Sequence, residues 1–262
     1  MRERIEHSVK DAISSVGMRR FWGVNSLHPA GRKYFEEVVL PSMLRGEKRS
    51  SLDCQKLLYG YEMEFVDEEK ISSEGPTVFV MNHWSKGPMR AWWHSCMASD
   101  SFRRMRGQDI KWIVQDALEL RVGRFHLGQE VPLFSQMQRL LIDAYQLVEV
   151  PSAFKGRGRM AMLDVVRRFT KGEVLGLTPE LEASTTLKRG SEQAGQLVGL
   201  LARKCPDGNL QPAYAMSEGD RLILKFGESR KIGDFADCGY QLVADRVMDE
   251  IRKLVPQAVN DC

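Results

Sequence analysis

Apolar and polar residues alternate with helical periodicity in the first part of the chain. Apolar residues recur at four-residue spacing over 5–13, which predicts an amphipathic helix. A second helix is expected over 31–43, and Pro41 predicts that it bends or ends early. The charged stretch 45–51 predicts a linker or an exposed turn. The N-terminal part is therefore expected to be helical.

From about Tyr59 the pattern changes to short apolar runs that alternate with helical stripes. The short run Thr77–Met81 is mainly apolar and is suited to a strand buried on both faces. The stripe over 162–169 predicts a helix that Gly172 ends. Further strands are expected at 63–66, 110–114, 146–150, 173–177, 210–216 and 222–226, and further helices from Pro88, at 133–144, 192–203 and 243–254. This order predicts an α/β fold with a largely parallel central sheet flanked by helices on both faces.

The change of pattern near Tyr59 also predicts the domain organisation. We expect an N-terminal helical appendage over 1–58 and one α/β domain over 59–262. A chain of 262 residues is long enough to bury a substantial core.

Composition and charge exclude several classes of protein. With 38 basic and 35 acidic residues and no long basic run, the chain is too balanced for a nucleic-acid binder. Its five cysteines form no C-x-x-C pair, so we expect reduced thiols and neither a disulfide framework nor a metal site. No run reaches the roughly 18 apolar residues of a membrane span, and the N-terminus lacks the apolar run of a signal peptide. The expected location is cytoplasmic, or peripheral on the cytoplasmic face of a membrane.

Candidate chemistry follows directly on the apolar run 77–81. Asn82 and His83 would stand at the carboxyl end of a buried strand, where open α/β sheets bind their ligands. The alternative is a histidine that caps the turn or packs in the loop.

The surrounding motifs and their order favour a functional role for His83 over the structural alternative. They are 75–83 (GPTVFVMNH), 171–180 (KGEVLGLTPE), 187–190 (LKRG), 210–215 (LQPAYA) and 222–227 (LILKFG). In this order they resemble the glycerolipid (lysophospholipid) acyltransferase family, to which 1-acylglycerol-3-phosphate acyltransferases belong. The resemblance covers roughly 59–256.

The resemblance implies transfer of a fatty acyl group from a thioester to a hydroxyl. The donor is acyl-coenzyme A or acyl carrier protein, used as a co-substrate without another cofactor. The acceptor is a lysophospholipid or a glycerol-phosphate-like molecule. His83 would take the proton from the attacking hydroxyl, and such base catalysis typically contributes about 10²- to 10⁴-fold.

One departure from the family concerns the partner of this histidine. The family motif places an aspartate where this chain has Pro88, and proline cannot accept a hydrogen bond from the imidazole. Disabling the comparable aspartate of serine hydrolases costs about 10⁴-fold. Glu180 is the first candidate for a replacement acid, because the family places this glutamate beside the cleft. Glu182 and Asp116 come next.

A second departure concerns the loop of Glu180. The family sequence Phe-Pro-Glu-Gly-Thr-Arg is replaced here by Leu-Thr-Pro-Glu-Leu-Glu, so its glycine has become Leu181 and its arginine has no match. Lys188, Arg189 and Arg157 would then contact the anionic group of the acceptor, although the loop of Arg157 is equally compatible with a solvated segment. The other substrate-binding residues that the resemblance implies are Asn82, Ser85 and Pro179.

Aromatic and basic residues suggest a membrane contact without requiring it. Trp84, Trp92 and Trp93 would line an acyl pocket or touch a membrane interface, whereas ordinary core packing is the alternative. Basic residues over 103–124 predict a peripheral surface for anionic lipid, with a solvated face as the alternative.

Three functional hypotheses follow. The first is an acyltransferase with His83 as its base and the Pro179–Glu180 loop opposite. The second is a non-catalytic relative that keeps the cleft to bind a lipid or an acyl carrier, since the aspartate, the glycine and an arginine are all missing. The third, a hydrolase, is disfavoured because the chain has no Gly-x-Ser-x-Gly nucleophile elbow.

Overall fold

A computed structural model describes most of the chain and divides it into two compact units. The first unit comprises 1–60 and 113–161, and the second comprises 61–112 and 162–262. The described residues are 24–51, 53–85, 92–115, 119–122, 125–130, 132–150, 158–180, 183–236 and 238–256, without the side chains of 25, 115–138, 158 and 159. The expected helix at 5–13, Pro88, Asp116, Arg157, Leu181 and Glu182 lie outside these residues.

The boundary near Gly60 lies close to the expected end of the N-terminal appendage. The sequence assigned 113–161 to the second domain, whereas the structure groups this segment with 1–60. The hydrophobic pattern of a segment predicts its helices and strands but not the segments with which it packs. The pattern of 113–161 therefore gave no sign that this segment groups with 1–60.

The helix expected at 31–43 is a continuous helical run with an altered centre. It consists of α3 (Pro29–Tyr34), the π-helix η2 (Phe35–Val39) and α4 (Leu40–Leu44). Pro41 has no N–H, and its ring clashes with the carbonyl four residues earlier in a regular α-helix. The wider π-helical turn lies just before Pro41, so the chain continues to Leu44 instead of ending early.

The rest of the first unit contains helices, a hairpin and one further strand pair. Its elements are η1 (Val24–Ser26), α5 (Asp53–Leu57), β4 (Glu119–Val122), β5 (Phe125–Glu130), α7 (Pro132–Tyr145), β6 (Val148–Val150) and the start of α8 (Gly158–Thr170). Strands β4 and β5 form an antiparallel pair in the basic segment, where the sequence pattern predicted no strand. Strand β6 pairs in parallel with Ile113–Gln115.

The second unit is built on a mainly parallel sheet. Its strands are β1 (Glu62–Val66), β2 (Thr77–Met81), β3 (Ile110–Gln115), β7 (Val174–Leu177), β8 (Asn209–Glu218), β9 (Arg221–Phe226) and the short β10 (Arg230–Lys231). They are ordered β1-β9-β8-β2-β7-β3, and β10 pairs with β8. Only the pairs of β8 with β9 and with β10 are antiparallel among them. The predicted α/β class with a largely parallel sheet is confirmed.

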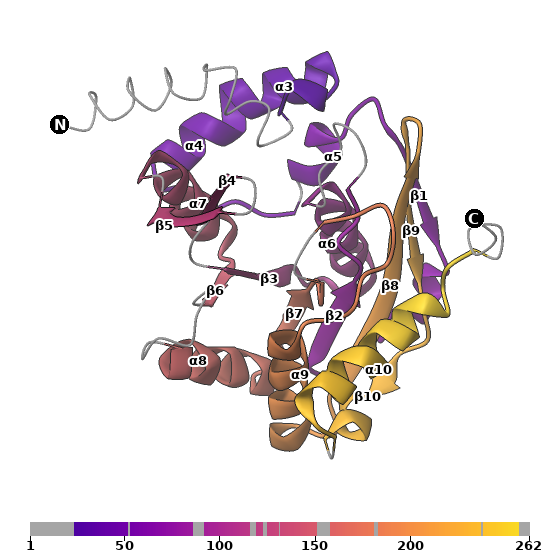
Figure 1. Cartoon of the computed structure of the whole chain (residues 1–262). Coiled ribbons are helices and arrows are strands. Elements are labelled where there is room, and N and C mark those ends of the chain that lie inside the picture. The colour runs from indigo at the N-terminus through magenta and orange to yellow at the C-terminus, as the bar shows by residue number, and fades with distance from the viewer. Residues whose placement is uncertain are drawn as a thin grey trace. The chain divides into compact units, whose positions relative to one another are not determined.

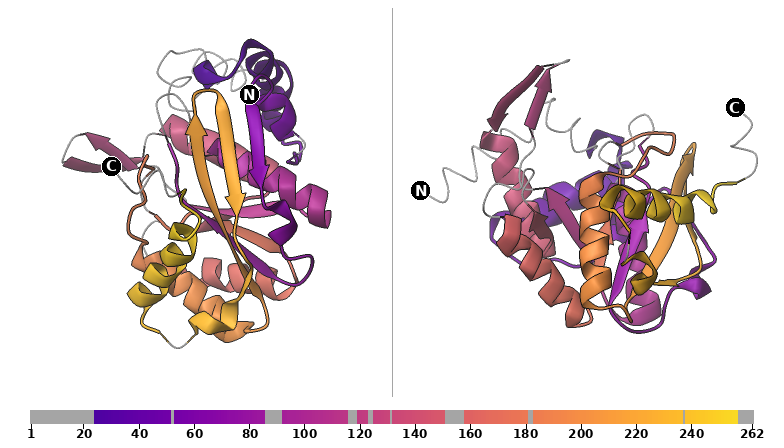
Figure 2. Two further views of the ribbon diagram at one scale, coloured as in Figure 1. Left: turned by 90° about the vertical axis from the view of Figure 1, so that its right-hand side faces the viewer. Right: turned by 60° about the horizontal axis from the view of Figure 1, so that its bottom comes forward.

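Helices flank this sheet, as the sequence pattern predicts. Helix α10 (Tyr240–Arg252) contacts β8 and β2 and packs beside α9 (Glu192–Lys204), while α6 (Trp92–Arg106) contacts β9 (Figures 1 and 2). Short 3₁₀ segments η3 (Glu68–Lys70) and η4 (Ile232–Phe235) complete the unit. All five residues of β2 are buried, and the ring of Phe79 packs against Phe102 of α6 and Trp112 of β3. Strand β2 is therefore the centre of the core.

No helix among the described residues is long and apolar enough to cross a membrane.

Candidate active site

The expected site lies where three neighbouring parallel strands end. Asn82–Ser85 follow β2, the loop 178–190 follows β7, and the last residues of β8 lie on the other side of β2. Because β7, β2 and β8 are parallel neighbours, their carboxyl ends meet at one edge of the sheet. The sequence prediction that His83 stands at such an edge is confirmed.

Asn82 extends the sheet by one step with its side chain. Its Nδ2 donates to the carbonyl of Ala215 at 2.9 Å, and its Oδ1 accepts from the N–H of Ala215 at 2.6 Å. The side chain is 3% exposed, so it substitutes for the backbone pairing that β2 stops providing after Met81. Asn82 thus fixes the direction of the chain just before His83, and its expected contact with substrate stays a prediction.

The main chain of His83 is held from the neighbouring loop. Its carbonyl accepts from the N–H of Ser184 at 2.9 Å, and the carbonyl of Ser184 accepts from the N–H of Ser85 at 3.1 Å. These bonds form a short parallel bridge between Trp84 and Ser184. Together they order the segment that bears His83, although the segment belongs to no regular strand.

The imidazole of His83 has an unsatisfied nitrogen. Nδ1 is buried and has no hydrogen-bond partner in the described part of the chain. Burial lowers the pKa of His83, so the neutral, proton-accepting form is favoured. An unpaired buried polar atom costs about 1–3 kcal/mol and calls for a physical explanation.

Glu180 lies next to His83 but bonds its main chain. Its side chain is buried, with one oxygen accepting from the N–H of His83 at 2.5 Å and the other from the N–H of Lys188 at 2.6 Å. Burial raises the pKa of Glu180, and the two hydrogen bonds oppose that rise. Among the described contacts it makes no hydrogen bond to the imidazole. The sequence expectation of a carboxylate against the ring is therefore not met by Glu180.

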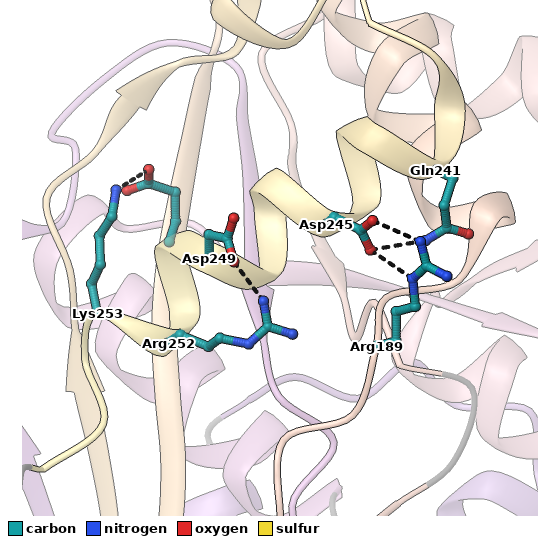
Figure 3. A network of polar contacts seen from close by, with 7 residues as sticks. Arg189, Gln241, Asp245, Asp249, Arg252 and Lys253 are labelled. Atoms are coloured by element: carbon teal, nitrogen blue, oxygen red, sulfur yellow. Dashed lines mark hydrogen bonds and ion pairs between the residues drawn. The ribbon is translucent and has the colours of Figure 1, made fainter. Parts of the chain in front are cut away.

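The expected anion-binding residues differ in their availability. Arg189 makes a bidentate ion pair with Asp245 of α10, at 3.0 and 2.9 Å, and Gln241 joins this network (Figure 3). Arg189 and Gln241 lower the pKa of Asp245 to about 2. The side chain of Lys188, the preceding residue, is exposed. The expected contact of Lys188 with an anionic acceptor stays a prediction.

Pro179 contributes to the loop through its main chain. The residue is buried, and its carbonyl accepts from the N–H of Ser191 at 2.9 Å, where α9 begins. Ser191 in turn caps α9 by accepting from the N–H of Ala194. Pro179 therefore connects the end of β7 with the start of α9, and its expected contact with substrate stays a prediction.

The tryptophans nearest to His83 are mainly core residues. Trp84 is buried, with its Nε1 donating to Ser217 at 3.0 Å. Trp93 is buried and packs against Tyr61 and Trp92. The core alternative considered for these indoles therefore holds for Trp84 and Trp93.

Residues at the end of β8 form hydrogen bonds with three side chains near the site, and the sequence did not indicate these bonds. Its consecutive residues Ala215, Met216 and Ser217 bind Asn82, His94 and Trp84 in turn. Two of the three residues contribute main-chain atoms, which have no residue-type signature in the sequence. This explains why no partner for His94 was predicted.

The burial of His94 is expected to make the stability of the protein depend on pH. It is buried with one hydrogen bond, between Nε2 and the carbonyl of Met216, and burial lowers its pKa from 6.5 to about 4. Between these two values the unfolded chain binds a proton that the folded protein does not. The free energy of unfolding should therefore fall with decreasing pH, by up to about 1.4 kcal/mol per pH unit from this group.

Urea unfolding at pH 7, 6 and 5 measures this effect. We expect His94→Gln, whose amide can still donate to Met216, to reduce the pH slope relative to wild type. Carboxylates contribute equally to both proteins, so the difference in slope isolates His94. Equal slopes would contradict the assignment.

Comparison with known proteins gives a limited result. Neither a family model nor a curated protein matches the sequence. Among solved structures, the chain is similar to the crystal structure of the 1-acyl-sn-glycerophosphate (LPA) acyltransferase, PlsC, from Thermotoga maritima. The identity is 12% and the TM-score 0.46, with 92% of this chain and 100% of the other covered. This similarity is too low to assign an activity.

Proposed function

We propose that the protein is an acyltransferase that moves a fatty acyl group from a thioester to a hydroxyl of a lysophospholipid or glycerol-phosphate-like acceptor. The observation that supports this most is the setting of His83. Its imidazole stands at the carboxyl edge of the central strand, in a neutral form, on a main chain fixed by Glu180 and Ser184. A neutral, ordered histidine at this edge is suited to general-base catalysis.

The proposed reaction needs a base and an anion-binding residue. His83 accepts the proton of the acceptor hydroxyl while the hydroxyl oxygen attacks the thioester carbonyl carbon. The C–S bond then breaks, and the imidazolium returns the proton to the leaving thiolate. Lys188, which is exposed two residues before the buried Gly190, would attract the negatively charged group of the acceptor. Acyl-coenzyme A and acyl carrier protein both remain candidate donors, at the cytoplasmic face of a membrane or in the cytoplasm.

A non-catalytic protein that binds lipid or an acyl carrier is the second candidate. It is favoured by the unpartnered Nδ1 of His83, because no carboxylate in the described part of the chain orients the ring. In that case the same edge of the sheet would bind the ligand without catalysing a reaction.

The test is thiol release from acyl-coenzyme A with a panel of lysophospholipid and glycerol-phosphate acceptors. We expect acceptor-dependent release by wild type and a loss of at least about 10²-fold in His83→Ala, because the base is removed. Glu192→Ala is the control, since Glu192 is an exposed residue of α9 in the same unit as His83. Circular dichroism and thermal melting verify that both variants are folded.

The same assay with acyl carrier protein as donor completes the test. No release from either donor by folded wild type would contradict the acyltransferase proposal. Saturable binding of a lysophospholipid under those conditions, measured by calorimetry, would support the binding protein instead.

A further inference from the structure

The carboxylate of Glu180 joins two loops that come from distant parts of the sequence. One oxygen accepts from the main-chain N–H of His83 and the other from that of Lys188, at 2.5 and 2.6 Å. The residue follows β7, whereas His83 follows β2. Both short hydrogen bonds therefore depend on a single side chain.

Burial makes these two bonds strong and their loss costly. Glu180 is 5% exposed, and a charge in such a place must be compensated by hydrogen bonds. Hydrogen bonds from N–H groups to an ionised carboxylate are shorter and roughly twice as strong as neutral ones. Lys188 and Arg252 add favourable charge interactions with the carboxylate. Each of the two N–H groups would be left without its acceptor if the carboxylate were removed.

The two loops bear the two residues on which the proposed reaction depends. His83 is the proposed base, and Lys188 is the proposed contact of the anionic acceptor. Glu180 touches both through their main chains and not through their side chains. A carboxylate in this position sets where the base stands relative to the acceptor-binding loop, and takes no part in proton transfer.

We propose that Glu180 is a positioning residue, whose carboxylate fixes His83 and Lys188 relative to each other through their main-chain N–H groups. The catalytic consequence of this role rests on the acyltransferase function proposed above. The two hydrogen bonds themselves do not, so they can be tested without activity.

The first test observes the amide protons of His83 and Lys188 by NMR between pH 7.5 and 4.5. A proton bonded to a carboxylate changes its chemical shift when that carboxylate is protonated. We expect both amides to shift with one common midpoint in wild type. In Glu180→Gln the common transition should disappear, whereas Glu192→Gln, at an exposed glutamate of α9, should retain it.

Either of two results would overturn the proposal. The amides of His83 and Lys188 would show no common transition in wild type, or the transition would persist in Glu180→Gln. Glu180→Asp provides a variant that keeps the charge but shortens the side chain, and we expect only one of the two amide protons to keep its pH-dependent shift.

A kinetic test applies if wild type transfers acyl groups. We expect Glu180→Gln to lower kcat by about 10- to 10²-fold, because a displaced base loses its alignment, and to raise the KM of the acceptor through Lys188. Glu192→Gln should change neither constant. An unchanged kcat in folded Glu180→Gln would refute the positioning role. An inactive wild type whose amides titrate together would refute only the proposed function.

Discussion

Replacing Asp53 by alanine is expected to lower the free energy of unfolding by about 3–5 kcal/mol, because the partly buried Arg49 would lose its buried carboxylate partner. Asp53 is 5% exposed in the first unit. It accepts hydrogen bonds from the hydroxyls of Tyr34 and Tyr145 at 2.8 and 2.9 Å, and it makes two contacts with the guanidinium of Arg49. One carboxylate thus connects α3, α7 and the start of α5.

The electrostatics of this cluster explain the size of the effect. The hydrogen bond to Asp53 raises the pKa of Arg49, and burial together with Asp53 raises the pKa of Tyr34. Both donors therefore remain protonated at neutral pH. Without Asp53 the charge of Arg49 and the two hydroxyls would be left in a largely buried site, which is the costly case for an ion pair.

Urea denaturation followed by circular dichroism measures the loss. Glu47→Ala is the matched control in the same unit, because Glu47 pairs with Arg45 on the surface at 2.5 Å. Exposed ion pairs contribute about 0–1 kcal/mol, so this variant should remain close to wild type. If Asp53→Ala were no less stable than Glu47→Ala, the buried cluster would have no structural importance.

The second large effect is expected for Gly195→Ala, which should destabilise the protein by about 3 kcal/mol. Gly195 lies where α9 packs against α10. A Cβ atom at this position would overlap the carbonyl oxygen of Tyr240 and lie 2.9 Å from the amide nitrogen of Ala244. Both atoms belong to the backbone of α10, so no side-chain rotation relieves the clash and the two helices must separate.

Gly199→Ala provides the control on the same helix. The nearest atoms to a Cβ there are Arg203 Nη1 at 3.5 Å and Val243 Cγ2 at 3.8 Å, which are ordinary contacts. Alanine is favoured over glycine inside a helix by about 1 kcal/mol, so Gly199→Ala should stabilise slightly. Thermal melting of the two variants should thus change in opposite directions. Equal changes would mean that the α9–α10 contact does not depend on Gly195.

The regular elements of the second unit could largely be predicted from the sequence. Strand β2 follows from a short, mainly apolar run, and α9 and α10 follow from apolar residues at helical spacing. These patterns are local, and burial of one face of an element requires them whatever its neighbours are. The position of His83 at a strand end was predictable for the same reason.

Other features of the fold depended on contacts between distant segments. The grouping of 113–161 with 1–60 and the hairpin of β4 and β5 were not predicted. Each of these outcomes depends on which surfaces pack together. Sequence periodicity shows that a surface is apolar but not which partner covers it.

The sequence by itself determined the α/β class, the strand that leads to His83, and the residue types at the edge of the sheet. Only the tertiary structure decided which hydrogen bonds and ion pairs those residues form. Within the described residues, Glu180 accepts a hydrogen bond from the main chain of His83 and none from its ring, and Arg189 forms an ion pair with Asp245. Every residue except proline offers the same main-chain N–H, so a hydrogen bond to it depends on where the chain passes and has no signature in the sequence.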